Sequence, residues 1–101
     1  MTTPKAFNWQ DILKESTPEL FKDVTGLQEK VLSEGALSVK TKTLMMMLCD
    51  ALLAHSDGVA GIAKRARALG ASDDEIAETL GVGFIMGGLP GLVTGSNAFR
   101  D

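Results

Sequence analysis

The stretch ALGASDDEIAETLGV, residues 68 to 82, contains the clearest helix boundary in the chain. Gly70 ends one apolar helical run, because glycine readily adopts the backbone conformation that follows a helix. Ser72 and Glu75 then have the spacing of a capping box, and Asp73 and Asp74 add negative charge to the first turn of the next helix. The stretch therefore predicts two consecutive helices joined by a short turn.

Helical spacing continues on both sides of this boundary. Upstream, one apolar stripe runs through Val59, Ile62, Ala63, Ala66 and Leu69. Downstream, the helix is expected to reach the pair Gly87 and Gly88, where the chain can turn, and a last helix is expected from about Pro90 toward Phe99. Gly91 and Gly95 each cost roughly 1 kcal/mol of helical propensity relative to alanine, so we expect another backbone to approach them closely.

The first third of the chain predicts a short helix or arm over about residues 8–15 and a longer amphipathic helix after it. Thr17 and Pro18 suit the N-terminus of the longer helix, and Gly35 suits its end. Its apolar stripe should pack on a core. Ser38 suits the cap of the following helix.

The composition indicates one all-α domain over residues 1–101, with residues 1–16 as an arm and residues 36–101 as the core. The hydrophobic share is 45%, yet there are only four Phe, one Trp and no Tyr, so small and flexible side chains must fill that core. The net charge of −3 disfavours binding to nucleic acid. We expect a cytoplasmic protein, because no stretch approaches a signal peptide or the roughly 20 apolar residues of a membrane span.

The segment LMMMLCDALLA, residues 44–54, contains one charged residue, Asp50. A helix that is apolar nearly all round needs cover on most of its surface, and so small a domain offers few internal neighbours. We therefore expect the chain to form a homo-oligomer through its apolar helices.

The order of parts from residue 36 onward resembles the carboxymuconolactone decarboxylase and alkylhydroperoxidase D-like family. The resemblance rests on ALGASDDEIAETLGV at 68–82 and GFIMGGLPGLVTGSNAF at 83–99. It implies a small helical bundle that works as a trimer or hexamer, with its site at the break between the central helix and the next helix.

The peroxidase members of that family, which act as antioxidants, carry a Cys-x-x-Cys pair and a histidine at that break. Counting back from Gly70, the resemblance puts those residues at His55, Gly58 and Ile62, so none of the three is kept. A glutamate of the peroxidase members falls near Thr43 and is also missing. Peroxide reduction needs a thiolate and a resolving thiol, and lactone decarboxylation needs a proton carrier, so the known chemistry lacks its usual groups.

The segment HSDG, residues 55–58, allows two interpretations. His55 and Asp57 could form a substitute acid–base pair, because a carboxylate near an imidazole favours its charged form and fixes its tautomer. Alternatively, His55 suits the negative end of one helix, and Ser56 or Asp57 can cap the next. The capping interpretation is favoured because it needs only local hydrogen bonds.

Two further groups are open to a functional or a structural interpretation. Cys49, the single cysteine, is expected to be a buried packing residue, and a redox role with a partner protein's thiol is the less favoured alternative. Met45, Met46 and Met47 could line a pocket for an apolar ligand, although core or subunit-interface filling is favoured.

Taken together, these residues predict an oligomeric family member that binds a small molecule or has a structural role, without peroxidase activity. The alternative is an enzyme that uses His55 and Asp57 on a small lactone or carboxylic acid, or Cys49 on hydroperoxides. The sequence predicts no cofactor and no metal site.

Overall fold

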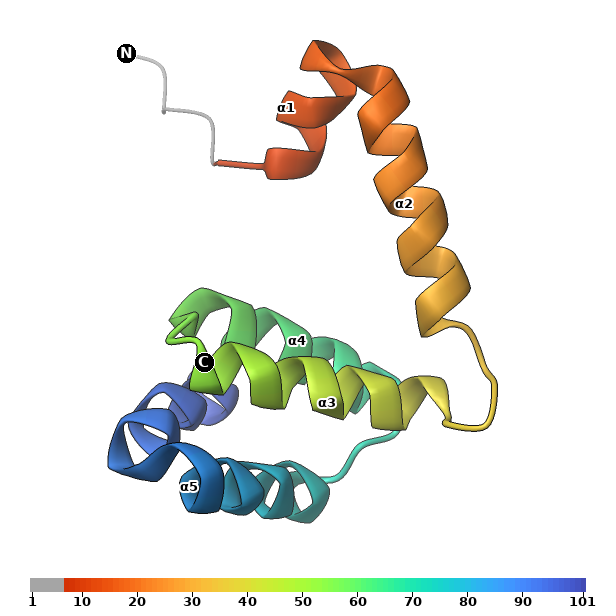
Figure 1. Ribbon diagram of the computed structural model, residues 1–101. Helices are drawn as coiled ribbons and strands as arrows, with labels where there is room; N and C mark the ends of the chain where they lie inside the picture. Colours follow the sequence, from red (N-terminus) through yellow and green to blue (C-terminus); the bar gives the residue numbers. More distant parts are fainter. Residues whose placement is uncertain (1–6) are drawn as a thin grey trace. The chain divides into compact units, whose positions relative to one another are not determined.

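The computed structural model describes residues 7–101 as a succession of helices (Figure 1). No strand occurs in that range, so the all-α prediction is confirmed. The chain divides into two compact units, with the boundary between Ser33 and Glu34. The arm of the sequence prediction begins in residues that lie outside the described range, and a single domain over residues 1–101 stays a prediction.

The first unit contains α1 (Trp9–Ser16) and α2 (Pro18–Leu32). The side chain of Asn8 caps α1 by accepting a hydrogen bond from the backbone N–H of Asp11 at 3.1 Å. Thr17 and Pro18 begin α2 as predicted, although the Thr17 side chain makes no capping hydrogen bond. Two expectations are wrong: α2 ends three residues before Gly35, and no residue of α2 is buried, so its apolar stripe covers no core within this unit.

The second unit is built on α3 (Val39–Leu52) and α4 (Ser56–Ala68), which lie side by side in Figure 1. Ser38 caps α3 as predicted, because its Oγ accepts from the N–H of Thr41 at 3.0 Å. The core is small and is made mainly of alanines with a few larger side chains. Its largest fully buried residues are Met47, Val59, Ile76 and Thr43.

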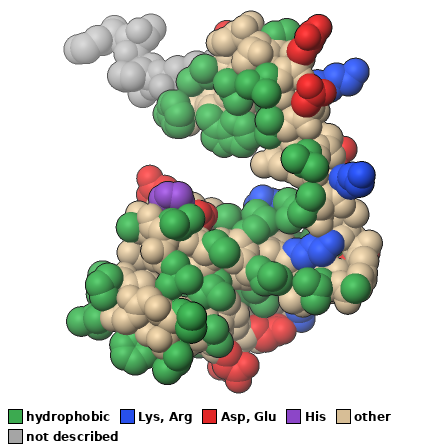
Figure 2. Space-filling model, viewed as in Figure 1, with side chains coloured by type: hydrophobic (Ala, Val, Ile, Leu, Met, Phe, Trp, Pro, Cys, Tyr) green, Lys and Arg blue, Asp and Glu red, His purple; other side chains and the backbone are tan. Residues whose placement is uncertain are grey.

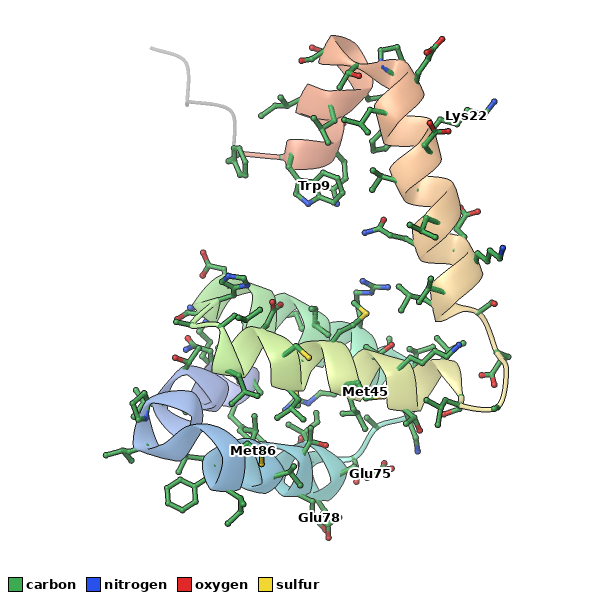
Figure 3. The ribbon with its side chains drawn as sticks, viewed as in Figure 1. Trp9, Lys22, Met45, Glu75, Glu78 and Met86 are labelled. Atoms are coloured by element: carbon green, nitrogen blue, oxygen red, sulfur yellow. The ribbon has the colours of Figure 1, made fainter. Side chains whose placement is uncertain are left out.

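The helix α5 (Asp73–Gly95) opens with the predicted capping box. Ser72 Oγ accepts from the N–H of Glu75, and the Glu75 carboxylate accepts from the N–H of Ser72. Glu75 and Glu78 project from the first turns of the helix (Figure 3). Lys40 Nζ lies 2.9 Å from Glu75 Oε2, which links the starts of α3 and α5.

The helix α5 is interrupted at Gly88, where φ is 69° and ψ is −163°. This left-handed φ is accessible to glycine at little cost. The chain then turns back, and an added methyl group on Gly91 would lie 3.4 Å from the carbonyl oxygen of Gly83. The predicted turn at Gly87 and Gly88 is therefore confirmed, and so is the close backbone approach at Gly91. At Gly95 the prediction is wrong, because the close neighbours are the side chains of Leu80 and Ala51.

The end of the chain, η1 (Ser96–Phe99), packs against α4. Arg67 holds it there, because its Nη1 donates to the carbonyl oxygen of Ala98 at 2.8 Å and its guanidinium lies 5.4 Å from the centre of the Phe99 ring. Arg67 also pairs with Asp73 at 3.1 Å. Arg67 is thus paired in the last turn of α4, where the helix dipole favours a cation.

The expectation that no stretch of the chain approaches the length and hydropathy of a membrane span needs correction. Residues 79–99 contain no charged side chain, and Asp73–Phe99 is long and apolar enough to cross a bilayer by length and composition alone. This is weak evidence for a span, because core helices pass the same test, and the helix is broken at Gly88.

Stability should depend on pH through Glu75. The hydrogen bonds from Lys40 and from the backbone N–H of Ser72 hold the pKa of Glu75 below its ordinary value of 4.5. A lowered folded-state pKa adds stability above the unfolded-state pKa, and this stability is lost as the pH falls through the folded-state value. Urea unfolding from pH 7 to pH 3 should show Glu75→Gln less stable than the parent at pH 7, with the difference vanishing toward pH 3. Glu78→Gln, one turn along α5, is the matched control; an equal loss there would contradict the assignment.

Candidate functional site

The break between α3 and α4 is a tight turn stabilised by Asp50 and His55. Helix α3 ends at Leu52, and Ala54 has a φ of 64°, the left-handed region that a non-glycine residue rarely adopts. This turn brings His55 back over the end of α3, where its backbone N–H donates to the carbonyl oxygen of Asp50 at 2.9 Å. The expectation that the apolar helix extends to Ala54 is therefore wrong.

The His55 ring binds Asp50 rather than Asp57. His55 Nδ1 lies 2.9 Å from Asp50 Oδ1, with 58% of the His55 side chain and 21% of the Asp50 side chain exposed. Figure 2 shows the histidine at the surface beside acidic side chains. Because a carboxylate only accepts hydrogen bonds, this contact favours a proton on Nδ1, and a neutral ring of that form has its acceptor at Nε2.

Asp57 has a different partner. Its Oδ1 accepts from Arg100 Nη2 at 2.6 Å, which ties the first turn of α4 to the end of the chain. The His55–Asp57 pair, which is the less favoured interpretation of the sequence, is therefore not formed. The capping prediction is half right. His55 lies at the negative end of α3, where its N–H donates to the Asp50 carbonyl oxygen, but neither Ser56 nor Asp57 is the cap of α4, because its N-cap residue is His55 and Ser56 is already the first helical residue.

Gly58 makes room for the Asp50 carboxylate. A methyl group on Gly58 would overlap Asp50 Oδ2 and would lie 2.9 Å from its Cγ and 3.4 Å from the Cβ of His55. Three residues at the junction of two helices, Asp50, His55 and Gly58, therefore form one compact cluster at the break. This Asp50–His55–Gly58 cluster is the candidate site.

Ile62 and Thr43 occupy the other two positions at which the family resemblance implies functional residues, and both have packing roles in this structure. Ile62 is half-buried and packs against the core. Thr43 is 1% exposed, and its hydroxyl donates to the carbonyl oxygen of Val39 at 2.8 Å in the preceding turn. Neither residue presents a proton-transfer group to the break.

The environment of Cys49 differs from the prediction. Cys49 precedes Asp50 on α3 and is exposed in the single chain, not buried. Helices α4 and α5 cover the faces of α3 that carry Met47 and Ala51, which leaves Cys49 outside. Of the three methionines, Met47 is fully buried in the core as predicted, whereas Met46 is half-buried and Met45 is exposed (Figure 3).

Within residues 7–101, the structure shows no group of three or more His, Cys, Asp or Glu side chains placed to hold a metal ion. The candidate site contains one imidazole and one carboxylate, which are hydrogen-bonded to each other. It is suited to hydrogen bonding and proton transfer.

The fold and the placement of this break define an all-helical protein whose polar site lies between the central helix and the next helix. Residues 18–101 match the model of the carboxymuconolactone decarboxylase family, so the chain belongs to that family. An uncharacterized protein of Methanocaldococcus jannaschii is 27% identical over 91 residues, which are 90% of this chain and 85% of that protein.

Two solved structures share the fold. One is a carboxymuconolactone decarboxylase family protein from Legionella pneumophila in its apo form, with a TM-score of 0.84 and 28% identity over 89% of this chain and 80% of that one. The other, from Burkholderia xenovorans, is proposed to be a carboxymuconolactone decarboxylase; its TM-score is 0.85, with 26% identity over 92% of this chain and 74% of that one.

Sequence reasoning missed Asp50 as a site residue. Asp50 and His55 are five positions apart, which is not a spacing that brings side chains together on one helix. The available signal was that Asp50 is the one charged residue of an apolar segment and lies near the negative end of its helix.

The left-handed turn at Ala54 should be detectable as strain. Alanine in this conformation costs roughly 1–2 kcal/mol, and glycine avoids most of that cost while losing more entropy on folding. Ala54→Gly should therefore raise the free energy of unfolding by about 0.5–1 kcal/mol in urea titrations. Ala77→Gly, at an exposed position inside α5, should lower it by about 1 kcal/mol. Destabilisation by both variants would show that Ala54 is not strained.

Proposed function

We propose that this protein is a cytoplasmic homo-oligomer of the carboxymuconolactone decarboxylase family that does not reduce hydroperoxides with a dithiol and instead binds a small molecule at the break between α3 and α4. The observation that carries the proposal is the Asp50 carboxylate seated against Gly58. The family resemblance puts the second cysteine of peroxidase members at this position.

The surroundings of Gly58 support the proposal. A cysteine at position 58 would direct its Cβ into the Asp50 carboxylate, so the local packing is built around a carboxylate and not around sulfur. The position of the family histidine holds Ile62, which packs on the core. The chain has one cysteine and cannot form an internal disulfide, which fits a reducing compartment.

A peroxidase assay tests the loss of dithiol chemistry. The purified chain should consume tert-butyl hydroperoxide in the presence of dithiothreitol no faster than its Cys49→Ala variant. A single exposed thiol can be oxidised to a sulfenic acid but has no resolving thiol in the same chain. Sustained turnover that disappears in Cys49→Ala would contradict the proposal and would instead support a peroxidase that works through Cys49 and an added thiol.

A second candidate function is favoured by the 2.9 Å contact between His55 and Asp50. In this alternative the protein is an enzyme, with His55 as the acid or base on a small lactone or carboxylic acid. Asp50 replaces Asp57 as the residue that orients the ring. His55 Nε2 would take a proton from carbon or oxygen of the substrate and later return it.

Variants of His55 and Asp57 separate these roles. For any activity found with small lactones or carboxylic acids, His55→Ala should reduce kcat/KM at least about 100-fold, the range expected for loss of a general acid or base. Asp57→Asn should change kcat/KM little, because Asp57 pairs with Arg100 at the surface. Unchanged activity in His55→Ala would exclude the enzyme candidate.

The oligomer proposal is supported by the apolar surface of α5. Apolar side chains gather over this helix in Figure 2, and those more than half exposed in the single chain are Val82, Ile85, Met86, Leu89 and Val93. Pairing identical copies through an uncharged surface brings no like charges together. Burial of this surface against another copy would also supply hydrophobic stabilisation that the small core of the second unit lacks.

Light scattering on a sizing column tests the oligomer. We expect a mass three or six times that of the 10.7 kDa chain. Ile85→Glu, which puts a charge into the apolar surface, should shift the population toward monomer, whereas Glu78→Gln should not. A monomer of the parent protein at micromolar concentration would contradict the proposal.

A further inference from the structure

Three features at the break each oppose ordinary helix formation. Ala54 adopts a left-handed φ of 64°. Asp50 places a carboxylate in the last turn of α3, the negative end of the helix dipole. Gly58 lies in the first turn of α4, and glycine has the lowest helical propensity of any residue except proline. Local costs that gather at one place are typical of functional sites.

All three features act on His55. The turn at Ala54 lets the His55 N–H reach the Asp50 carbonyl oxygen at 2.9 Å, and the Asp50 carboxylate binds the ring at 2.9 Å. The missing side chain of Gly58 leaves room for that carboxylate. His55 is thus held by its backbone and by its ring, while more than half of its side chain remains exposed.

We propose that Asp50 and Gly58 are positioning residues that keep the neutral His55 ring in the Nδ1–H tautomer, so that Nε2 forms a binding site for a small neutral molecule with an O–H donor, such as an alcohol, a phenol or an enol. The hydrogen bond to Asp50 fixes the proton on Nδ1. Nε2 is then the ring atom that can accept a hydrogen bond from a ligand.

The charges around the site explain the choice of a neutral ligand. The Asp50 carboxylate binds the ring directly, whereas the Asp57 carboxylate is paired with Arg100. While the ring is neutral it does not neutralise the Asp50 charge, and this charge disfavours an anionic ligand beside the ring. The proposed ligand class rests on the binding role proposed above, whereas the proposed tautomer does not. An experiment can therefore contradict the ligand class and still support the tautomer.

The tautomer can be measured directly because His55 is the only histidine of the chain. Nitrogen-15 NMR of the untagged protein, at a pH that keeps the ring neutral, shows which ring nitrogen carries the proton. The parent should be mainly Nδ1–H. Asp50→Ala should shift the tautomer ratio roughly tenfold toward Nε2–H, the effect of losing one hydrogen bond to a charged group. Asp50→Asn should give a smaller shift than Asp50→Ala, because its amide can accept from Nδ1–H through oxygen or donate to a bare Nδ1 through its NH2 group.

The role of Gly58 has its own matched pair. Gly58→Ala should shift the tautomer ratio in the same direction as Asp50→Ala, because the added methyl group displaces the carboxylate. Gly61→Ala, one turn along α4 with nothing within 4 Å of the added methyl, should leave the ratio unchanged, and so should Asp57→Asn. A parent protein that is mainly Nε2–H, or a ratio that neither Asp50→Ala nor Gly58→Ala changes, would overturn the positioning proposal.

Phenol and anisole test the ligand class. Phenol should bind and move the Nε2 resonance in the direction of hydrogen-bond acceptance, and anisole, which lacks the O–H, should not move it. Asp50→Ala should weaken phenol binding in proportion to the lost fraction of Nδ1–H ring, which is about two- to fivefold for a tenfold shift of the tautomer ratio from a mainly Nδ1–H parent. An Nδ1–H tautomer with no response to phenol would overturn the ligand class alone.

Discussion

The carboxylate of Asp50 can reach the ring of His55 only because residue 58 has no side chain. This packing constraint joins the last turn of α3 to the first turn of α4 and fixes the course of the chain between them. It also determines the chemistry available at the break. Where the family resemblance puts sulfur, this chain has a carboxylate against a glycine, so the site is suited to hydrogen bonding and proton transfer and has no dithiol. The chain belongs to the family and holds a single cysteine, so one chain cannot supply a dithiol at this break.

The helix α5 illustrates a second use of small residues. Its chain reverses at Gly88 and comes close enough that Gly91 approaches the Gly83 carbonyl oxygen. Gly87 and Gly91 likewise leave room for the side chain of Leu52 on α3. Close packing of this kind yields a thin core of alanines and leaves the larger side chains of α5 outside. The apolar surface proposed as the oligomer interface is thus a consequence of how the core is built.

Sequence reasoning succeeded where local rules decide the structure. The capping box at Ser72, the cap at Ser38 and the turn at Gly88 depend on residues within a few positions of each other, and all three are present. It failed where the outcome depends on a turn or on neighbouring helices. The pairing of His55 with Asp50 requires a left-handed alanine, for which the sequence carries no signal, and the exposure of Cys49 depends on which face of α3 its neighbours cover. The apolar stripe of α2 correctly predicted a helix, but it could not show that no core covers that stripe within its own unit.

A double-mutant cycle between Asp50 and Gly58 is the most direct test of the central claim. Alone, Gly58→Ala must displace the Asp50 carboxylate, and this cost offsets the gain that alanine brings to a helix. In an Asp50→Ala background the same substitution meets no carboxylate and should be stabilising. Urea unfolding at fixed protein concentration should therefore give an unfavourable coupling of about 1 kcal/mol or more between Asp50 and the methyl group added at position 58. Gly58→Ala should change the free energy of unfolding more favourably in the Asp50→Ala background than in the parent. Additive effects, within about 0.3 kcal/mol, would mean that the carboxylate does not occupy the space beside Gly58, and the account of this site would be wrong.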